Sequence, residues 1–227
     1  MFSVSRKILR QHPARYFHSS LSRKSNCPSC TKVLPSSLPA CTNCWHISSL
    51  PHNTKHYEIF GLPDEPNPFV IHLPTLKERF RSAQVLCHPD SWASKGAKAD
   101  MLRKNKLVVA QTLSARINEA YQCLLKPLSR AEYILNCHHL PVSEADQIDD
   151  IQFISGIMDA RETIEDATEK SQVENLVKKN TSEIRETIQE LENLFGRAQW
   201  EDAKSAAIRL RYLEGIERAA KRWLDDA

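Results

Sequence analysis

Four cysteines near the start of the chain have the spacing of a metal site. Cys27 and Cys30 form one Cys-x-x-Cys pair, and Cys41 and Cys44 form a second pair after ten intervening residues. Each pair can place two thiolates on one ion, and a compact loop can bring both pairs into a tetrahedral shell of four sulfurs. Such a shell leaves no open coordination position, so we expect one structural zinc ion per chain and not a catalytic one.

The segment that carries these cysteines, residues 26–54, is rich in Cys, Pro and Ser and is too short to bury a conventional core. Metal binding would supply the folding free energy that this segment lacks. Three other interpretations use the same residues: two disulfides, a redox-active pair or an iron–sulfur cluster. Because disulfides are uncommon in reducing compartments, we favour zinc.

A second group of reactive side chains is the His-Pro-Asp motif, formed by His88, Pro89 and Asp90. It sets an imidazole and a carboxylate beside a rigid turn. Proline cannot continue a helix and restricts the residue before it, so the motif should end the preceding helix. Cys87 and His88 could form a nucleophile and its base, but adjacent residues at a helix end rarely point at each other. We therefore do not expect a thiol enzyme at this position.

The helix before the motif is predicted to start near Pro74, because proline is favoured at the first helical position. Its apolar residues recur at spacings of four, three and four, which predicts one buried stripe. Three cations lie largely off this stripe: Lys77, Arg79 and Arg81. The stripe consists of Leu76, Phe80, Ala83 and Cys87. Cysteine often packs as a small apolar residue, so Cys87, Cys123 and Cys137 are all expected in the core.

The remaining elements indicate an all-α fold. A loop over residues 91–96 should join the first long helix to a second one as a helical hairpin. After an acidic linker, no proline occurs and three segments keep helical spacing, which favours an antiparallel three-helix bundle. No internal repeat is apparent in the sequence. The further helices are predicted over residues 97–125, 128–137, 146–168, 170–196 and 199–225.

Positive charge is concentrated near the N-terminus. Residues 1–57 carry a charge of +8 and no carboxylate, whereas the whole chain has a net charge of +3, which leaves the remainder at −5. A nucleic-acid-binding protein would spread basic residues over its folded surface, so we expect no nucleic acid as a partner. No apolar run approaches the length of a membrane span, so we expect no membrane contact either.

Residues 1–25 are rich in Arg, Lys and Ser, which is typical of a mitochondrial transit peptide. Arg15-Tyr16-Phe17 resembles the start of a matrix-peptidase cleavage site. A disordered basic tail is the alternative. The sequence therefore predicts a protein of the mitochondrial matrix.

A helix, the His-Pro-Asp motif and a second antiparallel helix resemble a J domain, here over residues 55–140. Three stretches are similar to the HscB-type iron–sulfur co-chaperones, called Jac-type in fungi. The resemblance runs from about Tyr57 to the C-terminus, and the tetracysteine segment is similar to an N-terminal extension of some eukaryotic members. The three stretches are Tyr57–Pro63 (YEIFGLP), Ser114–Leu124 (SARINEAYQCL) and Pro127–Leu135 (PLSRAEYIL).

The resemblance implies a co-chaperone with no enzymatic activity of its own. Its J domain would dock on a mitochondrial 70-kDa heat-shock chaperone and stimulate that chaperone's ATPase. His88, Pro89 and Asp90 would be the essential contact, and the three cations would steer the J domain toward an acidic face. An ordinary solvated helix face is the alternative for these cations. Position 91 is Ser, where many J domains carry Lys.

The resemblance also implies that the C-terminal bundle, residues 145–227, binds the iron–sulfur scaffold protein of the IscU/Isu type. Ile154 and Met158 match the family's apolar contacts, and Tyr212 matches an aromatic contact on the last helix. Ser155 and Gly156 depart from the family's pattern.

Helical spacing predicts two different faces on the first helix of the bundle, residues 146–168. Ile154 and Met158 are four residues apart and share a face. Phe153 and Ile157 point about 100° away from them. The helix could therefore bury the second pair and expose the first for binding, although one wide core stripe is the alternative.

Two other functions stay open at the level of sequence. A general J-protein that acts on unfolded chains would need a β-rich or Gly/Phe-rich substrate region, which this chain lacks. The second is a zinc-ribbon protein that binds nucleic acid. The net negative charge of the chain after residue 57 argues against it, because nucleic acid is itself negatively charged. The zinc module could stabilise the J domain, form a homodimer or bind another partner.

Overall fold

The computed structural model describes residues 25–93, 100–143, 145–146 and 148–227. Over these ranges the chain forms eight helices and two isolated antiparallel bridges, which confirms the predicted all-α class. No described helix is both long and apolar enough to cross a bilayer. The predicted transit peptide lies outside the described residues, apart from Ser25. The helices are α1 (His56–Phe60), α2 (Leu73–Cys87), α3 (Pro89–Ala93), α4 (Asp100–Leu125), α5 (Pro127–Cys137), α6 (Ile151–Glu165), α7 (Lys170–Gly196) and α8 (Trp200–Asp226).

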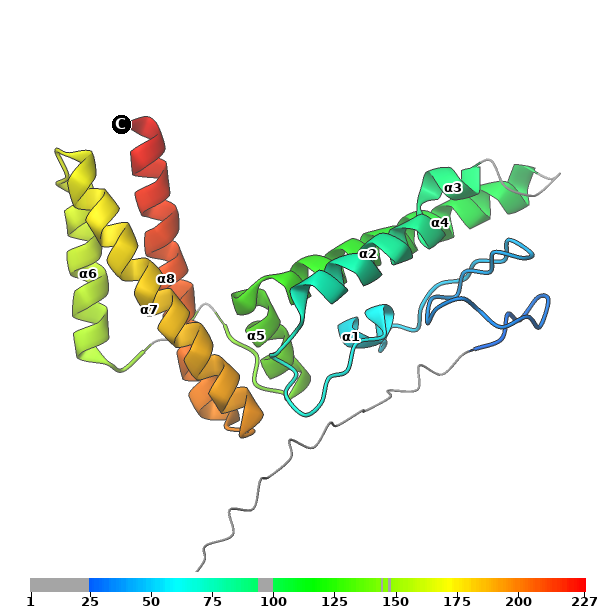
Figure 1. Cartoon of the computed structure of the whole chain (residues 1–227), viewed down its shortest axis with the longest axis horizontal. Coiled ribbons are helices and arrows are strands. Elements are labelled where there is room, and N and C mark those ends of the chain that lie inside the picture. Colours follow the sequence, from blue (N-terminus) through cyan, green and yellow to red (C-terminus); the bar gives the residue numbers. More distant parts are fainter. Residues whose placement is uncertain (1–24, 94–99, 144, 147) are drawn as a thin grey trace, which may run out of the picture.

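Helices α2 and α4 pack side by side as the predicted hairpin (Figure 1). Helix α2 starts one residue before Pro74 and ends at Cys87, because Pro89 cannot continue it. The whole predicted stripe of α2 is buried or half-buried against the rest of the hairpin core: Leu76, Phe80, Ala83 and Cys87.

The segment after the His-Pro-Asp motif differs from the prediction. The sequence predicted a loop from residue 91, but Pro89–Ala93 form the short helix α3. Proline suits the first turn of a helix, where its missing N–H is not needed. The Trp92 indole is 2% exposed, and its Nε1–H donates to the carbonyl oxygen of Leu86 at 2.9 Å. Burial of this one side chain therefore holds α3 against the end of α2.

Arg116 of α4 fixes the linker between the tetracysteine segment and α1. Its guanidinium donates to four backbone carbonyls over residues 50–54, at 2.7 to 3.3 Å. Helix α1 then ends at Phe60 and is capped by Gly61, whose φ of 59° lies in the left-handed region that glycine tolerates best. The tetracysteine segment is therefore anchored on the hairpin and is not connected to it by a free tether.

Helices α6, α7 and α8 form the predicted three-helix bundle (Figure 1). Helices α7 and α8 agree with the sequence prediction to within one residue, but α6 starts at Ile151 and not at residue 146. Asp150 causes this late start, since its carboxylate accepts a hydrogen bond from the Phe153 N–H at 3.1 Å and caps the helix. Inside the bundle, the buried Asn180 amide donates to the carbonyl oxygen of Leu213 at 3.0 Å and ties α7 to α8.

Helix α5 packs on α4 of the hairpin and shares a hydrophobic cluster with α7 and α8 of the bundle. Phe69, from the loop before α2, stacks on Phe195 of α7 with ring centroids 5.2 Å apart. At the edge of this cluster, the Glu132 carboxylate accepts from the Arg211 guanidinium of α8 at 2.9 Å. Buried contacts through α5 therefore set the orientation of the two parts, which the sequence did not predict.

The three cysteines outside the tetracysteine segment differ in burial. Cys87 is buried, which raises the pKa of its thiol to about 12, and Cys123 is half-buried. Cys137 is exposed, so the prediction that it packs in the core is wrong. It is the last residue of α5 and lies beyond the buried residues Ile134 and Leu135.

Candidate functional site: a metal centre and two interaction surfaces

The four cysteine side chains of the tetracysteine segment meet at one point. Their Sγ atoms all lie within 4.8 Å of one another. Cys27 Sγ lies 3.5 Å from Cys44 Sγ, and Cys30 Sγ lies 3.6 Å from Cys41 Sγ. Each contact thus joins one cysteine of the first pair to one of the second. This arrangement could hold a single metal ion, as the spacing predicted.

The segment is built from two equivalent loops, a repeat that the sequence analysis missed. An antiparallel bridge between Asn26 and Val33 closes the first loop, and the same bridge between Ala40 and Ile47 closes the second. In each loop the N–H of the first cysteine donates to a carbonyl five residues later, at 2.8 Å and 2.9 Å. The sequence feature that could have indicated the repeat is that residues 26–33 and 40–47, which are 14 positions apart, both place cysteines second and fifth and an apolar residue last.

Backbone amides aimed at sulfur favour the thiolate form in these loops. A hydrogen bond from the Lys32 backbone is the largest influence on Cys30 and holds the pKa of its thiol at about 6. The Cys44 backbone acts in the same way on Cys41 and lowers its pKa. Burial raises the pKa of Cys44 to about 11. Because the thiolate is the form that binds metal, the two lowered pKa values suit a metal centre.

The His-Pro-Asp motif spans the junction of α2 and α3, with His88 between the helices and Pro89 and Asp90 in the first turn of α3, at the end of the hairpin far from the bundle (Figure 1). The Asp90 side chain is 91% exposed, and that of His88 is 51% exposed. The Asp90 backbone N–H donates to His88 Nδ1 at 3.3 Å, which requires that nitrogen to be unprotonated. The 3.6 Å approach of Asp90 Oδ2 to the same nitrogen is therefore not an ion pair in this tautomer. The carboxylate faces solvent, where a cation of a partner can reach it.

Helix α2 presents the three predicted cations to solvent, since Lys77, Arg79 and Arg81 are all exposed. Toward α4, Gln84 donates to Asn118 Oδ1 at 2.8 Å and accepts from Ser114 Oγ at 3.0 Å. This polar link between the two helices was not predicted from the sequence. The sequence feature that could have indicated it is the polar pair Ser114 and Asn118, which lie four residues apart beside the apolar face of α4.

The structure brings Ile154, Met158 and Tyr212 together. All three line a hollow of about 150 Å³ between α6 and α8, called the α6–α8 hollow below. Ile154 is 39% exposed and Met158 is 65% exposed, whereas Ile157 is 7% exposed. Half-buried Phe153 meets the Tyr212 ring edge-on at 6.2 Å. Helix α6 therefore has the two faces that the spacing predicted, and it is not one wide core stripe.

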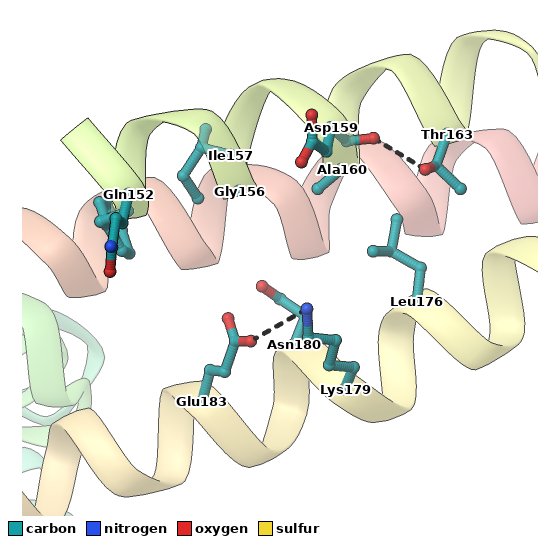
Figure 2. A pocket seen from close by; sticks show the side chains of 11 residues that line it. Gln152, Gly156, Ile157, Asp159, Ala160, Thr163, Leu176, Lys179, Asn180 and Glu183 are labelled. Atoms are coloured by element: carbon teal, nitrogen blue, oxygen red, sulfur yellow. Dashed lines mark hydrogen bonds and ion pairs between the residues drawn. The ribbon is translucent and has the colours of Figure 1, made fainter.

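A larger cavity of about 370 Å³ lies between α6 and α7 (Figure 2). Gly156 and Ala160 line it from α6, and a Cβ added at Gly156 would meet no other atom within 4 Å. Across the gap, Lys179 and Glu183 of α7 form an ion pair at 3.7 Å. The glycine that departs from the family's pattern thus lines an open cleft and makes no close helix contact.

Comparisons with known proteins identify the family. Residues 149–221 match the family model described as the HSCB C-terminal oligomerisation domain. The chain is also 31% identical to the co-chaperone protein HscB homolog of Aliivibrio fischeri (strain MJ11) over 166 residues, which are 71% of this chain and 91% of that protein. The chain belongs to the HscB co-chaperone family.

A human member of the HscB family is similar over a longer part of the chain. This protein, the iron-sulfur cluster co-chaperone protein HscB, is 28% identical over 186 residues, which cover 80% of this chain and 73% of the human protein. The crystal structure of human co-chaperone protein HscB matches with a TM-score of 0.72 at 22% identity, over 86% of this chain and 96% of that one. The second match shows that the two chains share a fold.

Proposed function

We propose that this HscB-family chain is a co-chaperone of iron–sulfur cluster assembly in the mitochondrial matrix. It binds the iron–sulfur scaffold protein through the bundle and delivers it to a 70-kDa heat-shock chaperone through the J domain. It also stimulates the ATPase of that chaperone and so promotes cluster transfer. Membership of the HscB family and the name of the human relative, an iron-sulfur cluster co-chaperone, support this proposal.

The observation that carries the proposal is the placement of two exposed surfaces at opposite ends of the folded molecule. The α2–α3 junction and helix α6 lie far apart in Figure 1, which has the longest axis of the molecule horizontal. The buried cluster around α5 connects the two ends. Two partners can therefore bind at once without overlap, as an adaptor requires.

On the chaperone side, the exposed Asp90 carboxylate accepts a charge-assisted hydrogen bond from an arginine of the chaperone. Pro89 fixes the turn in advance, so little conformational entropy is lost on binding. The cations of α2 (Lys77, Arg79 and Arg81) raise the association rate toward an acidic surface.

On the scaffold side, the α6–α8 hollow takes up an apolar side chain of the scaffold protein. Ile154 and Met158 supply exposed apolar surface, and Tyr212 supplies an aromatic wall. Apolar and aromatic residues around a small recess are the usual composition of a binding hot spot.

For the metal centre, we propose zinc held by Cys27, Cys30, Cys41 and Cys44. A tetrahedron with zinc–sulfur distances of about 2.3 Å has sulfurs about 3.8 Å apart. The observed separations of 3.5 and 3.6 Å are near this value and far above the roughly 2 Å of a disulfide bond. Four thiolates close the coordination shell, so the ion stabilises the segment and carries out no chemistry.

The proposed location depends on residues 1–25, which have the composition of a mitochondrial transit peptide. A second candidate activity is self-association through the bundle, which the description of the matching family model favours. Sedimentation of the purified chain at several concentrations would detect such a homodimer.

The proposed function is tested by reconstitution. ATP hydrolysis by the chaperone is measured with this chain alone, with the scaffold protein alone and with both. We expect the pair to stimulate hydrolysis more than either protein does by itself. A general J-protein would instead respond to an unfolded polypeptide, and absence of stimulation in every mixture would contradict both functions.

A further inference from the structure

We infer that Trp45 of the metal-binding segment is a positioning residue for the His-Pro-Asp motif. Metal binding and stimulation of the chaperone would then be coupled through one aromatic contact. This inference rests on the proposed function of the motif, and it assigns the tetracysteine segment a role in that function.

Among the equivalent positions at which the two loops of the tetracysteine segment differ, one carries a small side chain in the first loop and a large aromatic one in the second. Thr31 follows the second cysteine of the first loop, and Trp45 follows the second cysteine of the other loop. Both have left-handed backbone conformations, with φ of 60° and 55°. A bulky side chain is disfavoured there, where glycine would be free of strain. Thr31 is exposed, and its hydroxyl donates to the carbonyl oxygen of its neighbour Cys30 at 2.7 Å, whereas Trp45 is partly buried and packs on the J domain.

Trp45 contacts Trp92, a residue that closely follows the His-Pro-Asp motif. Its ring meets the Trp92 ring edge-on, with centroids 5.6 Å apart and an interplanar angle of 78°. This is a favoured geometry for an aromatic pair. Trp92 follows Asp90 by two residues and is itself nearly inaccessible to solvent.

Trp92 in turn holds the end of α2. Its Nε1–H donates to the carbonyl oxygen of Leu86, one of the last carbonyls of the helix, which have no partner within it. The motif therefore lies between two anchored points, Leu86 before it and Trp92 after it. A shift of the Trp92 ring would move both ends of the turn that presents the Asp90 carboxylate.

A bound metal fixes Trp45 because Cys44 is its neighbour in the chain, and the Trp45 N–H donates to the Cys41 carbonyl at 3.1 Å. Both ends of this loop are thus tied to the metal ligands. Loss of the metal would release the loop, free the Trp45 ring and leave one side of Trp92 without support. The bundle, at the far end of the molecule, would keep its scaffold surface.

The test compares Trp45→Gly with Thr31→Gly in the full chain. Glycine suits the left-handed conformation at both positions, so each variant should keep one metal ion per chain by elemental analysis. Trp45→Gly should raise the concentration that gives half-maximal ATPase stimulation by about two- to tenfold, the value of one aromatic pair. It should also speed hydrogen exchange of the His88 and Ser91 amides, which are bonded to Gln84 and His88 carbonyls. Thr31→Gly should change neither quantity.

Trp45→Phe should restore most of the stimulation, because a smaller ring can still meet Trp92. Unchanged exchange and unchanged stimulation in a metal-loaded Trp45→Gly protein would overturn the inference. So would an equal effect of Thr31→Gly, which would indicate a general loss of stability. If the unmodified chain gave no stimulation at all, the proposed function would fail, while the exchange rates of the two amides would still decide whether Trp45 positions the motif.

Discussion

The guanidinium carbon of Arg130 lies 4.7 Å from the centroid of the Phe69 ring, within the cluster that joins the hairpin to the bundle. Arg130 is 7% exposed, and its Nη1–H donates to the Leu124 carbonyl oxygen at 2.8 Å. Burial lowers the pKa of this guanidinium, but an arginine remains charged at neutral pH. Arg130 of α5 therefore supports Phe69, and Phe69 in turn stacks on Phe195 of α7.

We predict that Arg130→Met destabilises the protein by about 2 kcal/mol. Methionine keeps much of the volume but removes the cation–π contact and leaves the Leu124 carbonyl without its charged donor. Urea unfolding of the full chain measures this change. Arg185→Met, on the exposed surface of α7, is the control and should alter stability by less than about 0.5 kcal/mol. Equal stability of the two variants would show that the Arg130 contact does not hold the two parts together.

We predict that Asp90→Asn abolishes stimulation of the chaperone ATPase and leaves scaffold binding unchanged. Removing one charge of a close pair typically weakens binding by about 30-fold or more. The carboxylate is 91% exposed, so the free energy of unfolding should stay within about 0.5 kcal/mol of the unmodified chain. Glu78→Gln, an exposed carboxylate on α2, serves as the control and should keep full stimulation. Loss of both activities in Asp90→Asn would contradict the two-surface arrangement.

The sequence predicted features that depend on residue type and spacing. The two Cys-x-x-Cys pairs predicted the cysteine cluster, and Pro89 predicted the end of α2. Helix α3 was missed because it depends on burial of Trp92, which is a tertiary effect. The exposure of Cys137 depends on where α5 ends, and helical periodicity does not report this. The orientation of the bundle depends on Phe69, a residue in a proline-rich loop that shows no periodic pattern.

We predict that the full chain binds one zinc ion and that Cys41→Ser removes it. Cys41 is buried among the other three cysteines, and a serine hydroxyl is a poor replacement for a thiolate ligand. Elemental analysis measures the metal, and reaction with a thiol reagent shows whether four cysteines become accessible when a chelator is added. Cys137→Ser alters an exposed thiol outside the cluster and should retain the zinc. Two disulfides in the protein purified under reducing conditions would refute this prediction.

We predict that the double change Ile154→Ala and Met158→Ala weakens scaffold binding by about 30-fold or more, the usual effect of truncating a hot spot. Both side chains are exposed, so the bundle should keep its stability, whereas Tyr212→Ala should weaken binding and also destabilise α6 through Phe153. Calorimetry with the purified scaffold protein measures the affinity. Ile151→Ala is the matched control, because Ile151 is 82% exposed on the same helix but does not line the α6–α8 hollow. If this control weakened binding as much as the double change did, the scaffold would bind along the start of α6 and the hollow would not be its site.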